Sequence, residues 1–301
     1  MEKNKPFFSI IVPTFSRSDK LANCLESFTR LDYPKNRFHV VVVDDGSKVT
    51  PESVVSRFFN HLDVTLIMQA HAGPAAARNN GAKKARGKFL AFLDDDCSPA
   101  PDWLLRLQER FNQTPDAAIG GKTLGRVPMN IFSATSQMII DAVYDFYNKS
   151  AEGPHFFTAN NLAVPVDSFW NIGGFNASFT TSEDREFCHR WKSNRYRLIY
   201  APEIMIYHDD PITFWGFFRR HYRYGQGAFR FHYRRNGNHT RNNEEVLKFY
   251  LHLFSYPFSK EWDLRMLLVG ILIILAKSVY VGGYFMERFR LIRDTRFSKH
   301  K

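Results

Sequence analysis

Short apolar runs alternate with amphipathic stretches over the first third of the chain. Four runs rich in β-branched and aromatic residues predict buried strands, at residues 7–12, 38–43, 64–68 and 89–93. Between and after them, apolar residues recur at helical spacing and predict helices, one capped by Ser18 and others over residues 51–60, 73–85 and 101–111. This alternation predicts an α/β domain with a mostly parallel, Rossmann-like central sheet and flanking helices.

The pattern is less regular after residue 111. It predicts strands near residues 117–122, 156–164 and 197–200, and helices over residues 131–147 and from residue 183. Neither an internal repeat nor a low-complexity linker interrupts this part, so we expect one continuous domain over residues 1–211. Residues 212–301 form a second, helical region that is rich in basic and aromatic residues.

Polar residues follow three of the predicted strands directly. They are Pro13 and Thr14 after the first strand, Asp44 and Asp45 after the second, and Asp94, Asp95 and Asp96 after the fourth. In parallel sheets, ligands bind beyond these carboxyl ends. Side chains alternate along an extended chain, so Asp94 and Asp96 point to one side and Asp95 to the other. Paired carboxylates of this kind suit magnesium or manganese, and a solvated acidic turn is the alternative for the triplet alone.

The formal net charge of +11 is concentrated in the C-terminal region. Residues 1–211 contain 24 Lys+Arg and 24 Asp+Glu, whereas residues 212–301 contain 17 and 6. A cationic tail on a neutral body predicts an anionic partner, either a membrane surface or a nucleic acid. Three scattered cysteines without metal-type spacing predict reduced thiols in a cytoplasmic protein.

Residues 266–286 form an apolar stretch with a single charge, Lys277, at its middle. Its length allows a spanning helix, which needs about 20 residues. However, a Lys at the bilayer centre costs about 2.5–3.5 kcal/mol, and spanning would place the basic C-terminal end outside the cytoplasm. We therefore expect a peripheral or monotopic helix that binds anionic lipid on the cytoplasmic face of the cell membrane. The alternative is a soluble cytoplasmic protein with this helix in its core or in a homodimer interface.

Eight short motifs follow one another in order along residues 7–210. They are P-T-F-S-R at 13–17, V-V-D-D-G-S at 42–47, G-P-A-A-A-R-N-N-G at 73–81, F-L-D-D-D at 92–96, A-N-N-L at 159–162, G-G-F at 173–175, S-E-D at 182–184, and His208. Together they resemble a family 2 glycosyltransferase with the GT-A fold. The resemblance implies an inverting, metal-dependent enzyme that uses a nucleotide-diphosphate sugar. The Q-x-x-R-W motif of processive synthases is missing, which favours transfer of a single sugar over polymerisation.

The resemblance also implies residues that bind the donor nucleotide. Asp44 would accept a hydrogen bond from the base, uracil by default, with Pro13 and Thr14 as the other wall of the slot. The alternative for Asp44 is an ordinary D-D-G-S turn. Arg78 and Asn79 would approach the diphosphate, because a forked cation suits phosphate oxygens. The alternative for Arg78 is a solvated position on the helix surface.

Four further positions would bind the sugar moiety and a divalent cation. By resemblance, Asp94 and Asp95 contact the donor, and Asp96 binds manganese or magnesium. His208 would supply an imidazole to the same cation. The alternative for a lone histidine is a structural role.

The catalytic base implied by the resemblance is Asp184, with Glu183 as the second choice. Inverting transfer needs one carboxylate to take the proton of the acceptor hydroxyl. A helix N-terminus would keep Asp184 ionised, although the same residues also fit a capping box. Asn160, Asn161 and Gly174 would shape the acceptor side.

Two classes of function fit the sequence. The leading one is a glycosyltransferase whose acceptor is a glycan or a lipid-linked glycan, as in polysaccharide biosynthesis. The alternative is a non-enzymatic basic module that binds anionic lipid or nucleic acid through interleaved Arg and aromatic residues. It does not account for carboxylates at the strand ends, which repel phosphates without a metal, so we expect no nucleic-acid partner. A sugar-phosphate nucleotidyltransferase would need a glycine-rich loop after the first strand, and P-T-F-S-R-S-D-K has none.

Overall fold

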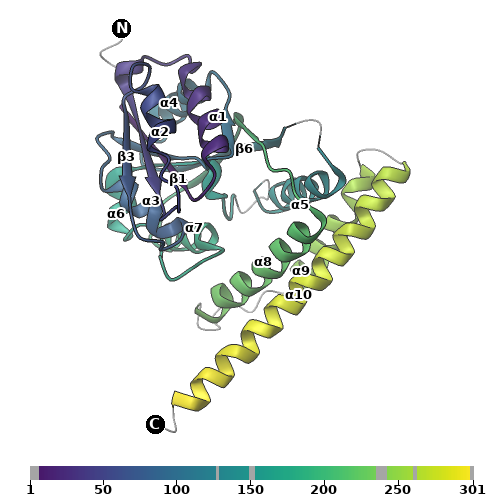
Figure 1. Cartoon of the computed structure of the whole chain (residues 1–301). Helices are drawn as coiled ribbons and strands as arrows, with labels where there is room; N and C mark the ends of the chain where they lie inside the picture. Colours follow the sequence, from purple (N-terminus) through teal and green to yellow (C-terminus); the bar gives the residue numbers. More distant parts are fainter. Residues whose placement is uncertain (1–6, 127–128, 149–152, 235–242, 260–262, 299–301) are drawn as a thin grey trace. The chain divides into compact units, whose positions relative to one another are not determined.

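The chain folds into two compact units, described by a computed structural model (Figure 1). The structure describes residues 7–126, 129–148, 153–234, 243–259 and 263–298. The first unit, which we call the sheet unit, comprises Met1–Arg126 and Glu152–Asp209. The second, the helical unit, comprises Val127–Ala151 and Asp210–Lys301. The segment Val127–Ala151, which we expected within the first domain, therefore belongs to the helical unit.

One mixed sheet of eight strands forms the centre of the sheet unit, in the order β3-β2-β1-β4-β7-β6-β8-β5. The first four in this order run parallel: β1 (Phe8–Thr14), β2 (Phe38–Asp44), β3 (Val64–Met68) and β4 (Phe89–Phe92). The others are β5 (Cys97–Pro99), β6 (Ala118–Gly125), β7 (Leu162–Pro165) and β8 (Leu198–His208). β7 is antiparallel to β4 and β6, β6 and β8 are parallel, and β5 is antiparallel to β8. This architecture confirms the predicted fold class.

Helices cover both faces of the parallel strands, as continuous apolar strand sequences predict. On one face, Ile10 of β1 lies in a core that includes α1 (Ser18–Thr29). On the other face, Ile11 meets α3 (Pro74–Ala82), where a Cβ on Gly81 would lie 2.5 Å from Ile11 Cγ2. Gly81 therefore lets the backbone of α3 lie directly against the sheet, and this contact fixes where α3 presents its polar residues.

The sheet unit contains further helices. They are η2 (Lys35–Arg37), α2 (Glu52–Val55), η3 (Ser56–Phe58), α4 (Trp103–Gln113), η4 (Ala159–Asn161), α6 (Val166–Asn171) and α7 (Glu183–Ser193). Two boundaries differ from the prediction in ways that affect the site. Ser18 is the first residue of α1 and not its cap, because the preceding Arg17 takes that position. β8 continues far beyond residue 200 and carries His208 into the sheet.

The helical unit has a core of its own. Its helices are α5 (Ile131–Asn148), α8 (Phe214–Arg234), α9 (Asn243–Ser255), the short η5 (Pro257–Ser259) and α10 (Leu264–Ser298). Buried side chains from α5, α8, α9 and α10 meet in this core, among them Ile139, Phe217, Leu253 and Ile273.

Glycines allow α8 to lie along α10, as Figure 1 shows. A Cβ on Gly225 would be 1.9 Å from the carbonyl oxygen of Tyr280, and one on Gly283 would be 2.1 Å from that of Tyr222. Real Cβ atoms do not approach backbone so closely, so the two helices touch through their main chains at these points.

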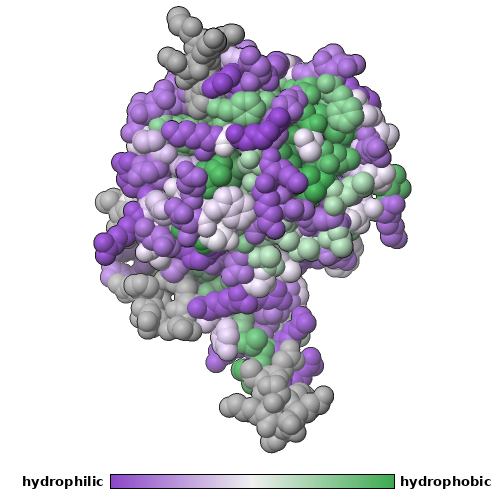
Figure 2. Space-filling view, turned by 90° about the vertical axis from the view of Figure 1, so that its left-hand side faces the viewer, coloured by the Kyte–Doolittle hydropathy of each residue, from purple (hydrophilic) through white to green (hydrophobic). Residues whose placement is uncertain are grey.

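α10 presents a long apolar surface. Leu264–Arg293 is long and apolar enough to cross a membrane; its most apolar 18-residue window has a mean hydropathy of 2.1, and 17% of that window is buried within the protein. Large apolar side chains are exposed along it, at Leu264, Leu267, Leu268, Ile271, Ile274, Leu275, Val281, Phe285, Met286, Phe289 and Ile292. Hydrophobic side chains also reach the largely hydrophilic face in Figure 2. Exposed apolar side chains alone therefore do not distinguish α10. What distinguishes it is that they continue along the whole of one helix.

Candidate active site

The carboxyl ends of β1, β2 and β4 lie side by side in the sheet. Thr14 pairs with Asp44 in the β1–β2 register, and Pro13 precedes it in β1. The Thr14 hydroxyl donates a hydrogen bond of 2.7 Å to Asp95, just beyond β4. The structure thus brings together the residues that the sequence placed around a donor.

Asp44 closes the turn that follows β2. Its carboxylate is buried, and Oδ1 accepts hydrogen bonds from the Ser47 hydroxyl and, at 3.2 Å, from the Ser47 backbone N–H. The turn alternative is therefore realised. It leaves Oδ2 for a further hydrogen bond, because a carboxylate has acceptor sites on both oxygens.

Asp45, which the sequence analysis left without a role, anchors the loop before α3. Its buried carboxylate accepts hydrogen bonds from Gln69 Nε2 at 2.7 Å and from the backbone N–H groups of Ala72 at 2.8 Å and Gly73 at 2.9 Å. These bonds hold the start of α3 against the end of β2.

Arg78 lies buried between two carboxylates and not on a solvated helix surface. It donates hydrogen bonds to Asp94 Oδ1 at 2.7 Å and to Glu183 Oε1 at 2.9 Å. Burial alone would lower the pKa of Arg78, but the charges of Asp94 and Glu183 raise it above the ordinary value. Its buried Nε has no hydrogen-bond partner among the described residues. One permanently charged side chain thereby joins the loop after β4 to α7, and its Nε–H group can still donate a hydrogen bond to a ligand.

Asn79 and Gly174 form a structural contact. The Asn79 amide donates to the Phe175 carbonyl at 2.7 Å and accepts from the Phe175 N–H at 2.8 Å. Gly174 has a φ of +67°, and a Cβ there would lie 2.7 Å from Asn79 Oδ1. Side chains other than hydrogen are therefore excluded at Gly174, and the amide of Asn79 is committed to the G-G-F turn.

Asp96 and His208 meet because β5 pairs with β8. Cys97 is the register partner of His208, and His208 Nε2 lies 3.3 Å from Asp96 Oδ1. The Cys97 thiol belongs to the same cluster, and burial and nearby carboxylates raise its pKa well above the ordinary value. The remaining pair, one carboxylate and one imidazole, fits a divalent cation.

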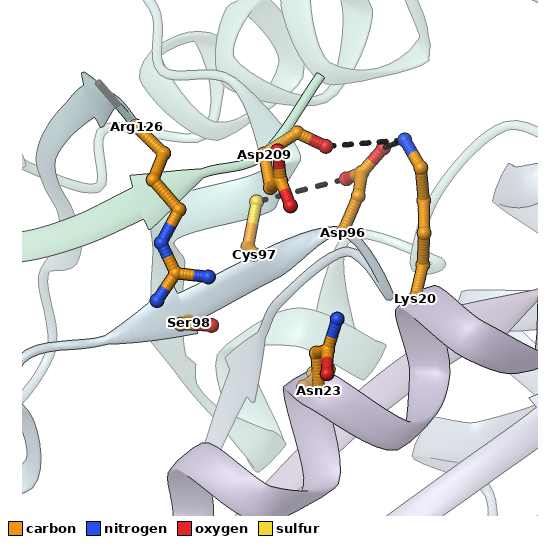
Figure 3. A pocket seen from close by; sticks show the side chains of 8 residues that line it. Lys20, Asn23, Asp96, Cys97, Ser98, Arg126 and Asp209 are labelled. Carbon is orange, nitrogen blue, oxygen red and sulfur yellow. Dashed lines mark hydrogen bonds and ion pairs between the residues drawn. The ribbon is translucent and has the colours of Figure 1, made fainter. Parts of the chain in front are cut away.

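Two cations that the sequence analysis missed contact the same carboxylates. Arg17 lies 2.6 Å from Asp95 Oδ1 and 2.8 Å from Asp96 Oδ2, and Lys20 lies 3.5 Å from Asp96 Oδ2. Lys20 also donates to the Asp209 carbonyl at 3.1 Å, as seen in the pocket of Figure 3. The available signal was their position: both stand at the start of a helix, where acidic residues are the usual choice.

The pKa values of Asp95 and Asp96 depart from the ordinary value in opposite directions. Burial raises the pKa of Asp95 to about 7, against the opposing effects of Arg17 and Thr14. Burial also acts on Asp96, but the hydrogen bond and charge of His208, with Arg17 and Lys20, bring its pKa below the ordinary value. Asp96 is thus held ionised, as a metal ligand must be.

Two adjacent carboxylates begin α7. Glu183 is buried and occupied by Arg78, whereas Asp184 is partly exposed and accepts the Arg185 N–H at 2.7 Å. Burial and the charge of Glu183 raise the pKa of Asp184 to about 7. This burial opposes the effect of the helix N-terminus, which we expected to keep Asp184 ionised. Ser182, at a φ of 66°, makes no side-chain capping hydrogen bond within the part of the chain that the structure describes.

Asn160 and Asn161 have different surroundings. The Asn161 amide is buried, accepts from Trp103 Nε1 at 3.0 Å and donates to the carbonyls of Lys122 and Ile204 at 3.1 Å and 3.0 Å. It thereby supports the irregularity in β6 between Gly121 and Lys122. Asn160 is partly exposed, with Nδ2 3.9 Å from Cys97 Sγ, beside the Asp96–His208 pair.

The chain belongs to glycosyl transferase family 2, whose sequence profile matches residues 9–180. It is 28% identical over 231 residues to the glycosyltransferase AglE of Haloferax volcanii, across 75% of this chain and 74% of that protein. It is 27% identical over 215 residues to the validoxylamine A glucosyltransferase of Streptomyces hygroscopicus subsp. jinggangensis, across 62% of this chain and 51% of that protein. The family membership confirms a glycosyltransferase and not a non-enzymatic binding module.

Solved structures confirm the GT-A fold. The mannosyltransferase PcManGT from Pyrobaculum calidifontis, in complex with GDP-Man and Mn2+, is similar at a TM-score of 0.63 and 17% identity, over 95% of this chain and 84% of that one. TarS 1–349 of S. aureus, in complex with UDP-GlcNAc, is similar at a TM-score of 0.56 and 17% identity, over 92% and 89%.

Proposed function

We propose that the chain transfers one sugar from a nucleotide-diphosphate sugar to a hydroxyl group of a glycan or lipid-linked acceptor, in a single inverting displacement. One observation carries this proposal: Arg78 joins Asp94, at the end of β4, to Glu183, at the start of α7. Asp94, which would bind the donor, and Glu183, the neighbour of the proposed base Asp184, thus flank one cation. The related structures support the donor class, since they hold GDP-Man with Mn2+ and UDP-GlcNAc.

The donor would lie across the ends of β1, β2 and β4. Asp44 would use its second oxygen for the base, uracil by default, beside Pro13 and Thr14. Arg78 would offer its Nε–H, which has no partner among the residues described, to a phosphate oxygen, because a buried donor of this kind favours an anionic ligand. Asp94, which pairs with Arg78, and Asp95, which accepts a hydrogen bond from Thr14, would face the ribose or the sugar.

Asp96 and His208 would hold a divalent cation. Such a cation, when bound, neutralises the charge that develops on the departing nucleoside diphosphate. The imidazole favours manganese over magnesium, which prefers oxygen ligands. Asp184 would take the proton from the acceptor hydroxyl, with Asn160 and the Gly174 turn on the acceptor side.

The helical unit would attach the enzyme to the cytoplasmic face of a membrane through the exposed side of α10. Lys277 is compatible with burial in lipid, because its charge makes cation–π contacts: Nζ lies 5.3 Å from the Tyr280 ring centroid and 5.9 Å from that of Phe249. The position of α8 argues against a membrane-spanning α10. α8 lies along α10, so it would carry its arginines into the bilayer, each at about 2.5–3.5 kcal/mol; they are Arg219, Arg220, Arg223, Arg230 and Arg234. An interfacial position keeps those cations near anionic headgroups.

The direct test of the catalytic proposal is Asp96→Ala. We expect the variant to lose the manganese-dependent part of its affinity for UDP, because His208 alone is a weak site. Calorimetric titration of UDP with and without Mn2+ measures this, and the exposed Asp63→Ala serves as control. Unchanged affinity and unchanged metal dependence in Asp96→Ala would overturn the assignment.

A further inference from the structure

Arg17 bridges two carboxylates of the site from the protein surface. Its two terminal nitrogens lie 2.6 Å from Asp95 Oδ1 and 2.8 Å from Asp96 Oδ2. The Asp95 side chain is fully buried and that of Asp96 is 6% exposed, whereas the Arg17 side chain is 43% exposed. The guanidinium therefore closes a buried anionic site from outside, on a side chain that has solvent to move into.

The two oxygens of Asp96 face different cations. Oδ1 faces His208 at 3.3 Å, whereas Oδ2 is shared by Arg17 at 2.8 Å and Lys20 at 3.5 Å. A divalent cation at Asp96 and His208 would thus lie within a few ångströms of two positive side chains on the same carboxylate. Like charges at such distances in a partly buried site repel strongly. The cation can bind well only if Arg17 gives way.

We propose that Arg17 is a positioning residue that couples cation binding to donor binding, an inference that rests on the proposed function. Without donor, the guanidinium neutralises Asp95 and Asp96 and thereby weakens the site for a divalent cation. A nucleoside diphosphate brings a second anionic partner for the guanidinium, which suits phosphate oxygens as well as carboxylates. Arg17 then moves from the carboxylates to the diphosphate, and the cation takes its place at Asp96. The cation and the donor therefore bind better together than separately.

The test is a calorimetric titration of the full-length protein with Mn2+, without nucleotide. We expect Arg17→Ala to bind Mn2+ at least about tenfold more tightly than the parent, because the competing charge-assisted hydrogen bonds are gone. The control is Arg30→Ala, which removes an exposed arginine paired with Glu26 and should leave Mn2+ affinity unchanged. Unchanged or weaker Mn2+ affinity in folded Arg17→Ala overturns the inference.

A second readout follows the coupling itself. The factor by which UDP increases Mn2+ affinity should be smaller in Arg17→Ala than in the parent, and Mn2+ should raise the melting temperature of the variant more. If Arg17→Ala does not fold, Arg17→Lys is the variant to test. Because Lys has no forked guanidinium, it should bind the two carboxylates less well, and the variant should bind Mn2+ more tightly than the parent. Parent protein that binds neither UDP nor Mn2+ overturns the proposed function as well, whereas normal binding with equal coupling in the variants overturns only the role of Arg17.

Discussion

Asp184 and Glu183 are neighbours in sequence but differ in what they can do. Glu183 is committed to the buried Arg78, while Asp184 has a pKa raised to about 7 by burial and by Glu183. A group that exchanges its proton near neutral pH and is partly exposed suits general base catalysis. This difference favours Asp184 over Glu183 on physical grounds.

Replacing Asp184 by Asn should reduce transfer by at least about a hundredfold while donor affinity stays close to that of the parent. In the parent, the base must be deprotonated, so kcat/KM should rise with pH up to about 7 and then level off. Product formation across pH 5–9 measures both effects. A variant that transfers at the parent rate would move the base elsewhere, with Glu183 as the next candidate.

Replacing Arg78 by Ala should destabilise the fold by about 3–5 kcal/mol, because it leaves Asp94 and Glu183 without their shared buried partner. The control is Arg86→Ala, whose pair with Asp63 is about half exposed and should matter by less than about 1 kcal/mol. Urea unfolding of both variants measures the difference. An equal decrease in the free energy of unfolding in both variants would mean that the buried ion pairs of Arg78 stabilise the fold no more than an exposed pair does.

The carboxylates of the candidate site could be predicted from the sequence, but their cations could not. Asp94, Asp96 and Asp184 were visible because acidic residues at strand and helix ends form recognisable motifs. Arg17 was visible only as one letter of a motif, since nothing local shows that its side chain reaches two carboxylates 78 and 79 positions later. Such a contact depends on the spacing of neighbouring strands, which no local pattern encodes.

Among the elements, those with long apolar runs were predicted best. β1 to β4 occur where the pattern placed them, within a residue or two. β8 was predicted too short because Pro202 and Glu203 interrupt its apolar pattern, and there its register with β6 also skips from Ala201 to Met205. β5 has three residues and was not predicted, since a strand so short exists only through its partner.

The contact between α8 and α10 can be tested with two neighbouring glycines. A Cβ at Gly283 would lie 2.1 Å from the Tyr222 carbonyl, whereas one at Gly282 would have no atom of the described residues within 4 Å. Gly283→Ala should therefore destabilise the helical unit by about 1–3 kcal/mol, while Gly282→Ala should be neutral or stabilising by up to about 1 kcal/mol. Thermal unfolding followed by circular dichroism compares them, and equal melting temperatures would contradict the close approach.

At the scale of the whole molecule, the sequence predicted a sheet unit followed by a helical region, and the structure contains both. It did not predict that 127–151, which falls between β6 and β7, belongs with the C-terminal helices. α5 is amphipathic like any surface helix, and its partners lie far along the chain. Hydrophobic pattern shows that a face is buried but does not identify what covers it.

The membrane proposal is tested with substitutions and not by truncation. Removal of α9 and α10 would expose the apolar side chains of α5 and α8 that pack against them. Replacing the exposed Leu267, Ile271 and Ile274 by Glu should reduce binding to anionic phosphatidylglycerol vesicles at least about a hundredfold, since three apolar side chains leave the lipid. Vesicle co-sedimentation measures this.

The matched control replaces three exposed apolar residues of the sheet unit by Glu, at Val49, Phe59 and Met68, and should bind normally. In the parent, neutral vesicles or high salt should weaken binding. Resistance to carbonate extraction would instead indicate a spanning α10, and equal binding by both triple variants would remove α10 from the interface.

The pairing of β5 with β8 has a consequence for biosynthesis. Asp96 and His208 are more than a hundred residues apart, and the pairing of these two strands brings them together. During synthesis on the ribosome, a nascent chain already contains its whole acidic triplet while the imidazole is still untranslated. The proposed cation site is therefore assembled last, after the final strand of the sheet has left the exit tunnel. A nascent chain that lacks β8 would thus contain the carboxylate of the proposed cation site without its imidazole.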